Sequence, residues 1–281
     1  GSGAAWGQAF TFQHGSKTYH TGETGSQLDA PALNVFCGGI IATAAGNFTI
    51  TIPAGLNLTW DTSIDTIPEL NMSGTGAAKI GGVSYSGGNK VMTLDVTVDF
   101  TFGPPADTLS IAGARFVLAG AASSGSLTYA GTASITAAGV ITLADNPAMT
   151  STTGQTLTPP GPQAANTITI TEPAALPAII AASNLRVRIP AGLDAEWDQA
   201  ITNPTFGGLA SGKVAAAVTY PDAKTLLVDV TADFVANDTL TIAGLQFANI
   251  DTDTSGQLTL SVGATNTTVH ATDPTTKTIV G

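Results

Sequence analysis

The amino-acid sequence contains the same β-rich segment twice, in tandem. Matched blocks in the two copies keep proline, glycine, leucine, tryptophan, aspartate and alternating apolar residues. The matched blocks are 47–61 (NFTITIPAGLNLTWD) with 184–198 (NLRVRIPAGLDAEWD), 91–100 with 225–234, and 107–116 with 238–247. Because nearly every residue that both copies keep suits packing or turns, the repeat predicts two copies of one scaffold and no shared reactive site.

Short runs within each copy alternate apolar and polar residues. Leu94–Phe100 and Leu226–Phe234 place apolar side chains on one face with a period of two, which is typical of half-buried strands in antiparallel sheets. Turn-forming glycine, proline, asparagine and aspartate separate these runs at about ten-residue spacing. No window of a dozen residues carries a 3.6-residue period. The sequence therefore predicts an all-β fold with two tandem antiparallel β-sandwich domains.

The limits of the repeat divide the chain into four predicted segments. Residues 30–145 and 166–281 are the two sandwich repeats. Residues 146–165, rich in proline and polar side chains, are predicted to form an extended linker between them. Residues 1–29 are predicted to form an N-terminal arm, because they have no recognisable counterpart in the second copy.

The N-terminal arm carries one β-prone stretch, Phe10, Thr11, Phe12 and Gln13. Such an extra strand has two possible pairing partners. It pairs with the edge of its own domain, or it adds to the sheet of a neighbouring subunit and so joins copies of the chain. Residues 278–280 at the other end are a second candidate for an inter-subunit strand.

The composition excludes several classes of protein. Hydrophobic residues make up 43% of the 281 residues and charged ones 10%, which is incompatible with a disordered chain. Nine Lys and Arg against twenty Asp and Glu give a net charge of −11, so a nucleic-acid surface is not expected. The single cysteine, Cys37, forms no intrachain disulfide. Neither a signal peptide nor a membrane span is recognisable, and abundant threonine and glycine with little lysine favours an extracellular, prokaryotic surface protein.

The acidic and aromatic residues do not form a catalytic pattern. Asp95 and Asp99 lie on one strand face about 13 Å apart, whereas the carboxyl pairs of glycosidases lie about 5–10 Å apart in a cleft. A solvated outer face explains them more simply. Trp60 and Trp197 are predicted to fill the two cores, because exposed aromatic platforms for sugars need more aromatic residues than the 6% present. We therefore expect no enzymatic activity.

One turn matches part of a calcium-binding loop. Asp251, Asp253 and Ser255 alternate in DTDTSG and place hard oxygens before a glycine, as in the first half of an EF-hand loop. The twelfth position of such a loop is Val262 here, and the first copy has no acidic residue in the matching turn. The alternative is a polar β-turn whose side chains bond their own backbone. Calcium is the one cofactor that the sequence suggests.

Five Asn-x-Ser/Thr triplets offer glycosylation candidates. Those at Asn71, Asn237 and Asn266 lie in predicted turns, where an acceptor must be exposed. In a threonine-rich chain such triplets also arise by chance, so they are candidates only.

The order of the repeated motifs resembles a family of repeat domains. The motifs IPAG-L-x-x-x-W-D, L-x-V-D-V-T-A-D-F and DTLTI-x-GLxF resemble Ig-like β-sandwich modules strung in tandem in large bacterial surface and secreted proteins. The second copy carries them best, within Ile189–Trp197, Lys213–Tyr220 and Leu227–Phe247. The resemblance implies an Ig-like fold and an extracellular, architectural role.

These observations lead to two functional hypotheses. The first is an extracellular structural protein, the subunit of a surface filament or layer built from copies of itself by strand addition and head-to-tail contacts. The alternative is a calcium-dependent adhesin or a carbohydrate-binding surface module, whose partners would be glycans or other surface proteins.

Overall fold

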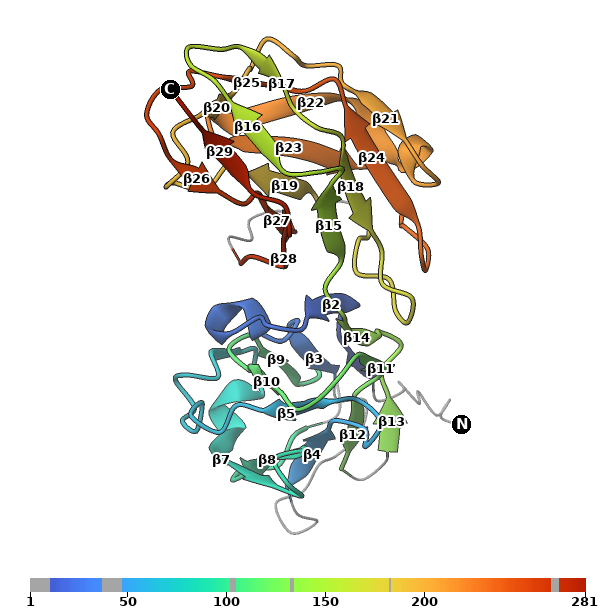
Figure 1. The fold of residues 1–281 in the computed structure, drawn as a ribbon. Helices are drawn as coiled ribbons and strands as arrows, with labels where there is room; N and C mark the ends of the chain where they lie inside the picture. Colours follow the sequence, from blue (N-terminus) through green and yellow to red (C-terminus); the bar gives the residue numbers. More distant parts are fainter. Residues whose placement is uncertain (1–10, 37–46, 102–104, 132–133, 182, 264–267) are drawn as a thin grey trace. The chain divides into compact units, whose positions relative to one another are not determined.

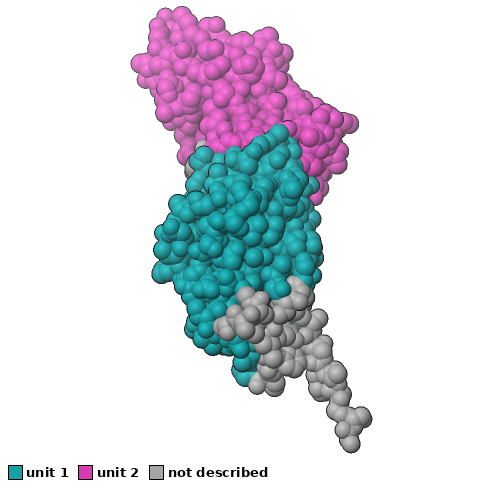
Figure 2. Space-filling view, turned by 90° about the horizontal axis from the view of Figure 1, so that it is seen from below, with its two compact units in different colours: residues 1–19, 23–143 teal, residues 20–22, 144–281 magenta. Residues whose placement is uncertain are grey.

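The two copies of the repeat form two separate β-sandwich units (Figures 1 and 2). The computed structural model describes residues 11–36, 47–101, 105–131, 134–181, 183–263 and 268–281. Unit 1 comprises Gly1–Tyr19 and Glu23–Leu143, and unit 2 comprises His20–Gly22 and Ala144–Gly281. The regular elements described are strands and short 3₁₀ turns, which confirms the predicted all-β fold.

Unit 1 contains the first fourteen strands and two of the 3₁₀ turns. They are β1 (Thr11–Gln13), β2 (Lys17–His20), η1 (Gly25–Leu28), β3 (Leu33–Phe36), β4 (Phe48–Thr51), β5 (Leu58–Trp60), β6 (Met72–Ser73), η3 (Ala77–Lys79), β7 (Ile80–Ser86), β8 (Val91–Val96), β9 (Thr108–Ile111), β10 (Phe116–Leu118), β11 (Ser123–Gly125), β12 (Thr128–Ala130), β13 (Ser134–Thr136) and β14 (Ile141–Ala144).

Unit 2 repeats this order. Its elements are β15 (Ala148–Ser151), β16 (Gln155–Leu157), β17 (Gln163–Ala164), β18 (Ile168–Thr171), β19 (Leu185–Arg188), β20 (Glu196–Trp197), β21 (Thr205–Gly207), η4 (Ser211–Lys213), β22 (Val214–Asp222), β23 (Thr225–Val230), β24 (Thr239–Ala243), β25 (Gln246–Ala248), β26 (Ser255–Gly256), β27 (Thr259–Val262), β28 (Ala271–Thr272) and β29 (Lys277–Ile279). None of the helical turns described in either unit is long and apolar enough to span a membrane.

Each unit pairs its strands in the same way. A four-stranded sheet has the order β1-β3-β9-β6 in unit 1 and β15-β18-β24-β21 in unit 2. A five-stranded sheet has the order β13-β12-β4-β8-β7 and, in unit 2, β28-β27-β19-β23-β22. A three-stranded sheet has the order β11-β14-β2 in unit 1 and β26-β29-β16 in unit 2, where β16 and β29 run parallel. A further small sheet is β10-β5 in unit 1 and β17-β25-β20 in unit 2.

The core of each unit lies between its sheets because the strands alternate as the sequence predicts. In unit 1, Val35 and Leu109 of the four-stranded sheet share one buried cluster with Ile50 and Leu94 of the five-stranded sheet. All four side chains are at most 2% exposed. Unit 2 has its own buried cluster, built from the matching strands. Period-two patterning alone therefore accounts for which residues are inside.

The predicted N-terminal arm and linker are wrong, because both segments are the first strands of a sandwich. In unit 1, Phe12 of β1 pairs with Val35 of β3, and in unit 2 Met149 of β15 pairs with Ile170 of β18. Thus residues 11–36 correspond to residues 148–171, and the N-terminal strand is not an addition to the repeat. This correspondence is not visible as identical residues, because the two segments share only the positions of their buried apolar side chains.

Candidate functional site: a polar groove on unit 1

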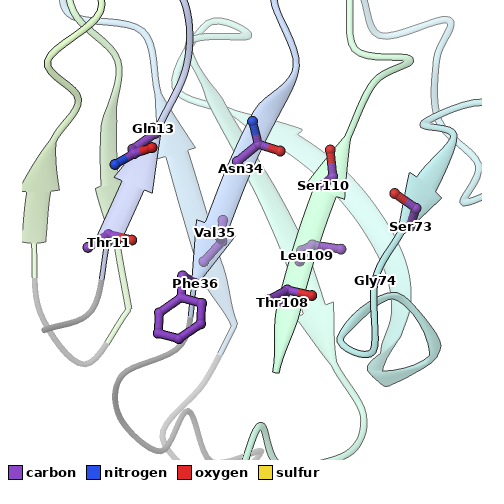
Figure 3. A pocket seen from close by; sticks show the side chains of 10 residues that line it. All are labelled: Thr11, Gln13, Asn34, Val35, Phe36, Ser73, Gly74, Thr108, Leu109 and Ser110. Carbon is purple, nitrogen blue, oxygen red and sulfur yellow. The ribbon is translucent and has the colours of Figure 1, made fainter. Parts of the chain in front are cut away.

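A groove lies on the outer face of the four-stranded sheet of unit 1 (Figure 3). Its volume is about 320 Å³. The lining residues come from β1, β3, β6 and β9 and the turn after β6, and all are uncharged. They are Thr11, Gln13, Asn34, Val35, Phe36, Ser73, Gly74, Thr108, Leu109 and Ser110.

One row of polar side chains crosses this face from strand to strand. Gln13 lies opposite Asn34, Asn34 lies opposite Ser110, and Ser110 lies opposite Ser73. Directly opposite residues in adjacent strands have their Cβ atoms about 4.5–5.5 Å apart, so the row presents two amides and two hydroxyls at regular spacing. Figure 3 shows these four side chains on one side of the groove.

A second row, formed by Thr11, Phe36 and Thr108, crosses the sheet one pleat away. Phe36 is half-buried and is the one aromatic ring among the lining residues. Between the rows Val35 and Leu109 face the core, which fixes the outward direction of their neighbours. The groove thus combines a polar row with an aromatic surface.

The turn at the end of the groove requires glycine. Gly74 has a φ of 92°, and a Cβ on it would lie 2.4 Å from the carbonyl oxygen of Thr108. Gly208 repeats this arrangement in unit 2, with a φ of 82° and a Cβ position 2.3 Å from the carbonyl oxygen of Thr239. The close approach of backbone at this sheet edge therefore belongs to the scaffold of both copies.

The polar row itself differs between the copies. At the positions of Gln13, Asn34, Ser110 and Ser73, unit 2 has threonines on three strands and a glycine on the fourth. The unit 2 row consists of Thr150, Thr169, Thr241 and Gly207. The same scaffold therefore carries an amide and hydroxyl row in unit 1 and a threonine row in unit 2.

Each unit has an ion pair with a buried aspartate that belongs to the scaffold. The Nζ of Lys79 lies 2.6 Å from Oδ2 of Asp107, and the Nζ of Lys213 lies 2.7 Å from Oδ2 of Asp238 in the matching place. Burial acts to raise the pKa of Asp107, but the hydrogen bonds from Lys79 and from Thr101 outweigh it and lower that pKa to about 2. Hydrogen bonding by Lys213 likewise lowers the pKa of Asp238.

Unit 2 has a further ion pair, in which Lys277 and Asp273 are both 1% exposed. The Nζ–Oδ2 distance is 2.9 Å, and the carboxylate also accepts the backbone N–H of Ser151 and of Thr275. Burial opposes ionisation of Asp273, yet these donors lower its pKa. Unit 1 has buried apolar residues at the same register positions, Ile141 for Lys277 and Ala137 for Asp273.

A buried carboxyl in unit 2 also serves the backbone. Glu172 is 2% exposed and accepts the N–H groups of Ala178 and Ile179. Burial raises its pKa in spite of these bonds. The carbonyl oxygen of Ala178 lies 2.9 Å from Nε2 of His20, whose ring packs against His270 with the centroids 4.7 Å apart. This cluster ties down the segment that follows β18.

The two repeated tryptophans lie in the cores, as expected. Trp60 is 1% exposed, stacks on Phe116 at 4.9 Å and donates its indole N–H to the carbonyl of Ile50. Trp197 is 2% exposed and stacks on Phe247 at 5.0 Å. Removal of about 200 Å² of aromatic surface from water contributes about 5 kcal/mol before entropic costs. Neither ring is available as a platform for a sugar.

The carboxylates weighed for catalysis, Asp95 and Asp99, are both exposed. Asp95 projects from β8, and the backbone carbonyl of Asp99 accepts a hydrogen bond from the Nζ of Lys79. The solvated outer face predicted for these aspartates agrees with their exposure.

The DTDTSG turn is exposed and bonded to its own surroundings. Asp253 accepts the backbone N–H of Gly281 at 2.7 Å, and Ser255 belongs to β26, opposite Thr278. Asp194 supplies the carboxylate that bonds Thr252 between the two aspartates. Within the described chain, the ligand oxygens of Asp251 and Asp253 do not gather with a third acidic or histidine ligand within 4.8 Å of one another.

The candidate inter-subunit strand lies in its own sheet in the single chain. Thr11, Phe12 and Gln13 form β1, pair with β3 and bury Phe12 to 3% exposure, while Phe10 lies outside the described residues. The C-terminal candidate, residues 278–280, likewise lies in or directly after β29 of unit 2. In the structure the N-terminal strand therefore pairs with the edge of its own domain, the first of the two expected arrangements.

Two glycosylation candidates lie in exposed turns. Asn71 has a φ of 46° and Asn237 a φ of 65°, and both are exposed. Asn266 lies outside the described residues. The turn positions agree with the prediction.

The groove residues were not singled out by the sequence, apart from Thr11 and Gln13 as strand residues. Ser73 lies in the Asn71 triplet and Ser110 in the repeated block 107–116, but no motif connects either of them with Asn34. The available signal is the contrast between the copies, in which residues 167–171 of the second copy read TITIT and residues 32–36 of the first read ALNVF. Without the strand register this contrast has no visible meaning.

Comparison with known proteins gives distant likenesses to solved structures. No protein-family model matches the chain, and no curated protein matches its sequence. The C-terminal domain of the Streptococcus pyogenes antigen I/II-family protein AspA is 7% identical, with 97% of this chain and 98% of that chain covered and a TM-score of 0.44. The collagen adhesin CNA from S. aureus is 8% identical (96% and 92% covered, TM-score 0.28). The full-length major pilin SpaD from Corynebacterium diphtheriae is 13% identical (84% and 58% covered, TM-score 0.30). At these identities and TM-scores the likenesses assign neither an activity nor a partner to this chain.

Proposed function

We propose that the chain is an extracellular structural protein, a subunit of a surface fibre or layer made of its own copies. The observation that carries the proposal is where the two units place the charged side chains of their ion pairs. Lys79 with Asp107, Lys213 with Asp238 and the Lys277 pair all stabilise the sandwich, and the groove holds no charged side chain. A scaffold repeated in this way supports a role in assembly more than one in catalysis.

The edge strand β1 supports exchange between copies as the mode of assembly. It pairs with β3 through three residues, Thr11 to Gln13, and lies at the end of the four-stranded sheet. A short edge strand is the element that leaves a sheet at least cost, and another copy of the same strand fits the vacated edge. In contrast, the long edge strand β22 (Val214–Asp222) is irregular in register and contains Pro221, which disfavours addition there.

A disulfide that fastens β1 to its own sheet tests this mode. Gln13 and Asn34 lie directly opposite each other, so the Q13C/N34C variant in a C37S background forms a cross-strand disulfide when oxidised. We expect polymers of the full chain under reducing conditions and monomers after oxidation, measured by negative-stain electron microscopy and light scattering. The C37S chain alone controls for the oxidant.

Three outcomes separate the parts of the proposal. Polymers that form equally well from the oxidised variant would exclude strand exchange and leave head-to-tail contact between intact units. A chain that stays monomeric under all conditions at high concentration would overturn the structural role itself. Polymers only in the reduced variant support both parts.

The calcium-dependent alternative has less support in the geometry. Asp253 is engaged with the backbone of Gly281, and Asp251 contributes its carboxylate to no gathered ligand set within the described residues. A hard divalent cation needs six or more oxygens around it. The turn is accounted for as a bonded surface loop.

A further inference from the structure

We propose that the groove of unit 1 is a binding site for a neutral glycan chain. The first argument is the pattern of differences between the two copies. The inward residues Val35 and Leu109 correspond to Ile170 and Leu240 of unit 2, so the core face keeps its apolar character. The outward row changes from threonine and glycine to amides and serines. Because packing accepts both rows, packing does not explain the amide row.

The amide row has the chemistry that a polyol needs. A carboxamide offers two N–H donors and an acceptor oxygen, and a hydroxyl offers one donor and two acceptor lone pairs. Gln13 is exposed and makes no side-chain hydrogen bond to any described residue, and the same holds for Ser73 and Ser110 in its row. Asn34 makes one long contact, 3.5 Å from Nδ2 to the carbonyl oxygen of Ala32. These groups are free to bond the neighbouring hydroxyls of a sugar ring.

Phe36 supplies the apolar part of such a site. Its ring lies one row from Asn34, half-buried at the end of β3, where Figure 3 shows it beside the groove. A sugar ring presents polar hydroxyl edges and an apolar C–H face, so amides on one side and an aromatic ring on the other match its two kinds of surface.

Charge and size narrow the ligand class. None of the ten lining residues is charged, and the chain as a whole carries −11, so an anionic ligand would be repelled and a cationic one would find no partner in the groove. The volume of about 320 Å³ lies at the lower end of ligand pockets, which begin at about 300 Å³. The groove is open along the sheet, and it therefore fits one or two neutral sugar units of a longer chain.

The second copy provides a matched control. The variant Q13T/N34T/S110T/S73G gives unit 1 the row that unit 2 carries on the same scaffold, so the fold is expected to remain intact. The reciprocal variant T150Q/T169N/T171F/T241S gives unit 2 the amide row and, at Thr171, the ring that Phe36 supplies in unit 1. It retains Gly207, since a Cβ there would lie 2.6 Å from Oγ1 of Thr241. Near-identical thermal melts establish that both variants are folded.

The experiment titrates the ¹⁵N-labelled full chain with cellohexaose, maltohexaose, xylohexaose and a mannose oligosaccharide, with sialyllactose as the anionic comparison. We expect at least one neutral oligosaccharide to shift the side-chain NH₂ signals of Gln13 and Asn34. The unit 1 variant should bind it at least tenfold more weakly, and the reciprocal variant should add a second site.

Several results would overturn the proposal. The first is that no neutral oligosaccharide shifts these signals at a concentration on the order of 10 mM, ten times a dissociation constant of about 1 mM. The second is that the unit 1 variant binds the oligosaccharide as tightly as the unchanged chain. Binding of an extended peptide with the same dependence on the amide row would assign the groove to a polypeptide instead. The site needs no assembled fibre, so its failure and that of the structural role are independent.

Discussion

The buried ion pair between Lys277 and Asp273 allows a quantitative test, because the first copy shows what replaces it. Unit 1 has Ile141 and Ala137 at the matching positions. We therefore consider K277I, D273A and the double variant, which transplants the apolar pair into unit 2. Each single change leaves one partner of a fully buried pair alone, and the double change does not.

The expected free energies follow from what each variant leaves unpaired. K277I leaves a carboxylate that still accepts bonds from Ser151 and Thr275, so we expect a loss of about 3 kcal/mol in unfolding free energy, the lower end for a broken buried pair. D273A leaves the ammonium group of Lys277 with no carboxylate and only Thr275 as acceptor, and it leaves the backbone donors without an acceptor. We expect a loss of about 4–5 kcal/mol. The double variant should lose about 2 kcal/mol of unfolding free energy, because only the backbone N–H groups of Ser151 and Thr275 are left without an acceptor.

The assay must report unit 2 separately, since a chain of two units need not unfold in one step. Trp197 is buried in unit 2 and serves as its reporter in a W6F/W60F background. At about 3 °C per kcal/mol for a unit of this size, the single variants should lower Tm by roughly 10–15 °C and the double variant by roughly 6 °C. A double variant as destabilised as the sum of the singles would show that the pair is not coupled and would refute the reasoning.

Three further predictions follow from other sites. The pKa of Asp107 is about 2 in the folded chain and about 3.9 in the unfolded chain, so its ionised carboxylate contributes about 2 kcal/mol to stability above pH 4, and this contribution is lost as pH falls toward 2. Acid unfolding followed at Trp60 should be less steep in D107N, and an identical acid profile would contradict this. G208A introduces a Cβ against the carbonyl of Thr239 at a positive φ and should destabilise unit 2 by about 3 kcal/mol in urea unfolding, whereas G192A, with open space around it, should cost less than 1 kcal/mol. Calcium at millimolar concentration should leave the Tm of unit 2 unchanged relative to EDTA, and a rise of several degrees that D253N abolishes would restore the calcium site.

The sequence predicts the inside of this protein better than its strand order. Alternation identifies Ile50, Leu94 and Val228 as core residues because the burial of apolar side chains is a local property of a strand with period two. The local sequence does not show that Phe12 and Met149 have equivalent positions in the two units, since strands of three or four residues keep too few identical residues to be aligned. Hence an arm and a linker were expected where the structure has the first strands of each sandwich.

The candidate site was less predictable than the fold, for a physical reason. Gln13, Asn34, Ser110 and Ser73 come from four strands that are far apart in the sequence, and only the sheet register brings them into one row. A short motif reflects chemistry that neighbouring residues carry out together, and no two of these residues are neighbours. The same holds for Lys277, whose burial depends on strands from both ends of unit 2.

The parallel pairing of β16 with β29 has a mechanical consequence. The strand β16 follows β15 near the beginning of unit 2, β29 is the last strand of unit 2, and β16 and β29 run side by side in the same direction. A pull on the two ends therefore shears all the hydrogen bonds of the pair together, whereas an antiparallel hairpin would open one bond at a time. In unit 1, the N–H of Lys17 in β2 donates to the carbonyl of Val140 directly before β14, and β2 and β14 are neighbours in one sheet, so an early and a late strand are joined there as well. Since resistance to forced unfolding depends on the unfolding rate, we expect a pull on the ends of either unit to unfold it slowly.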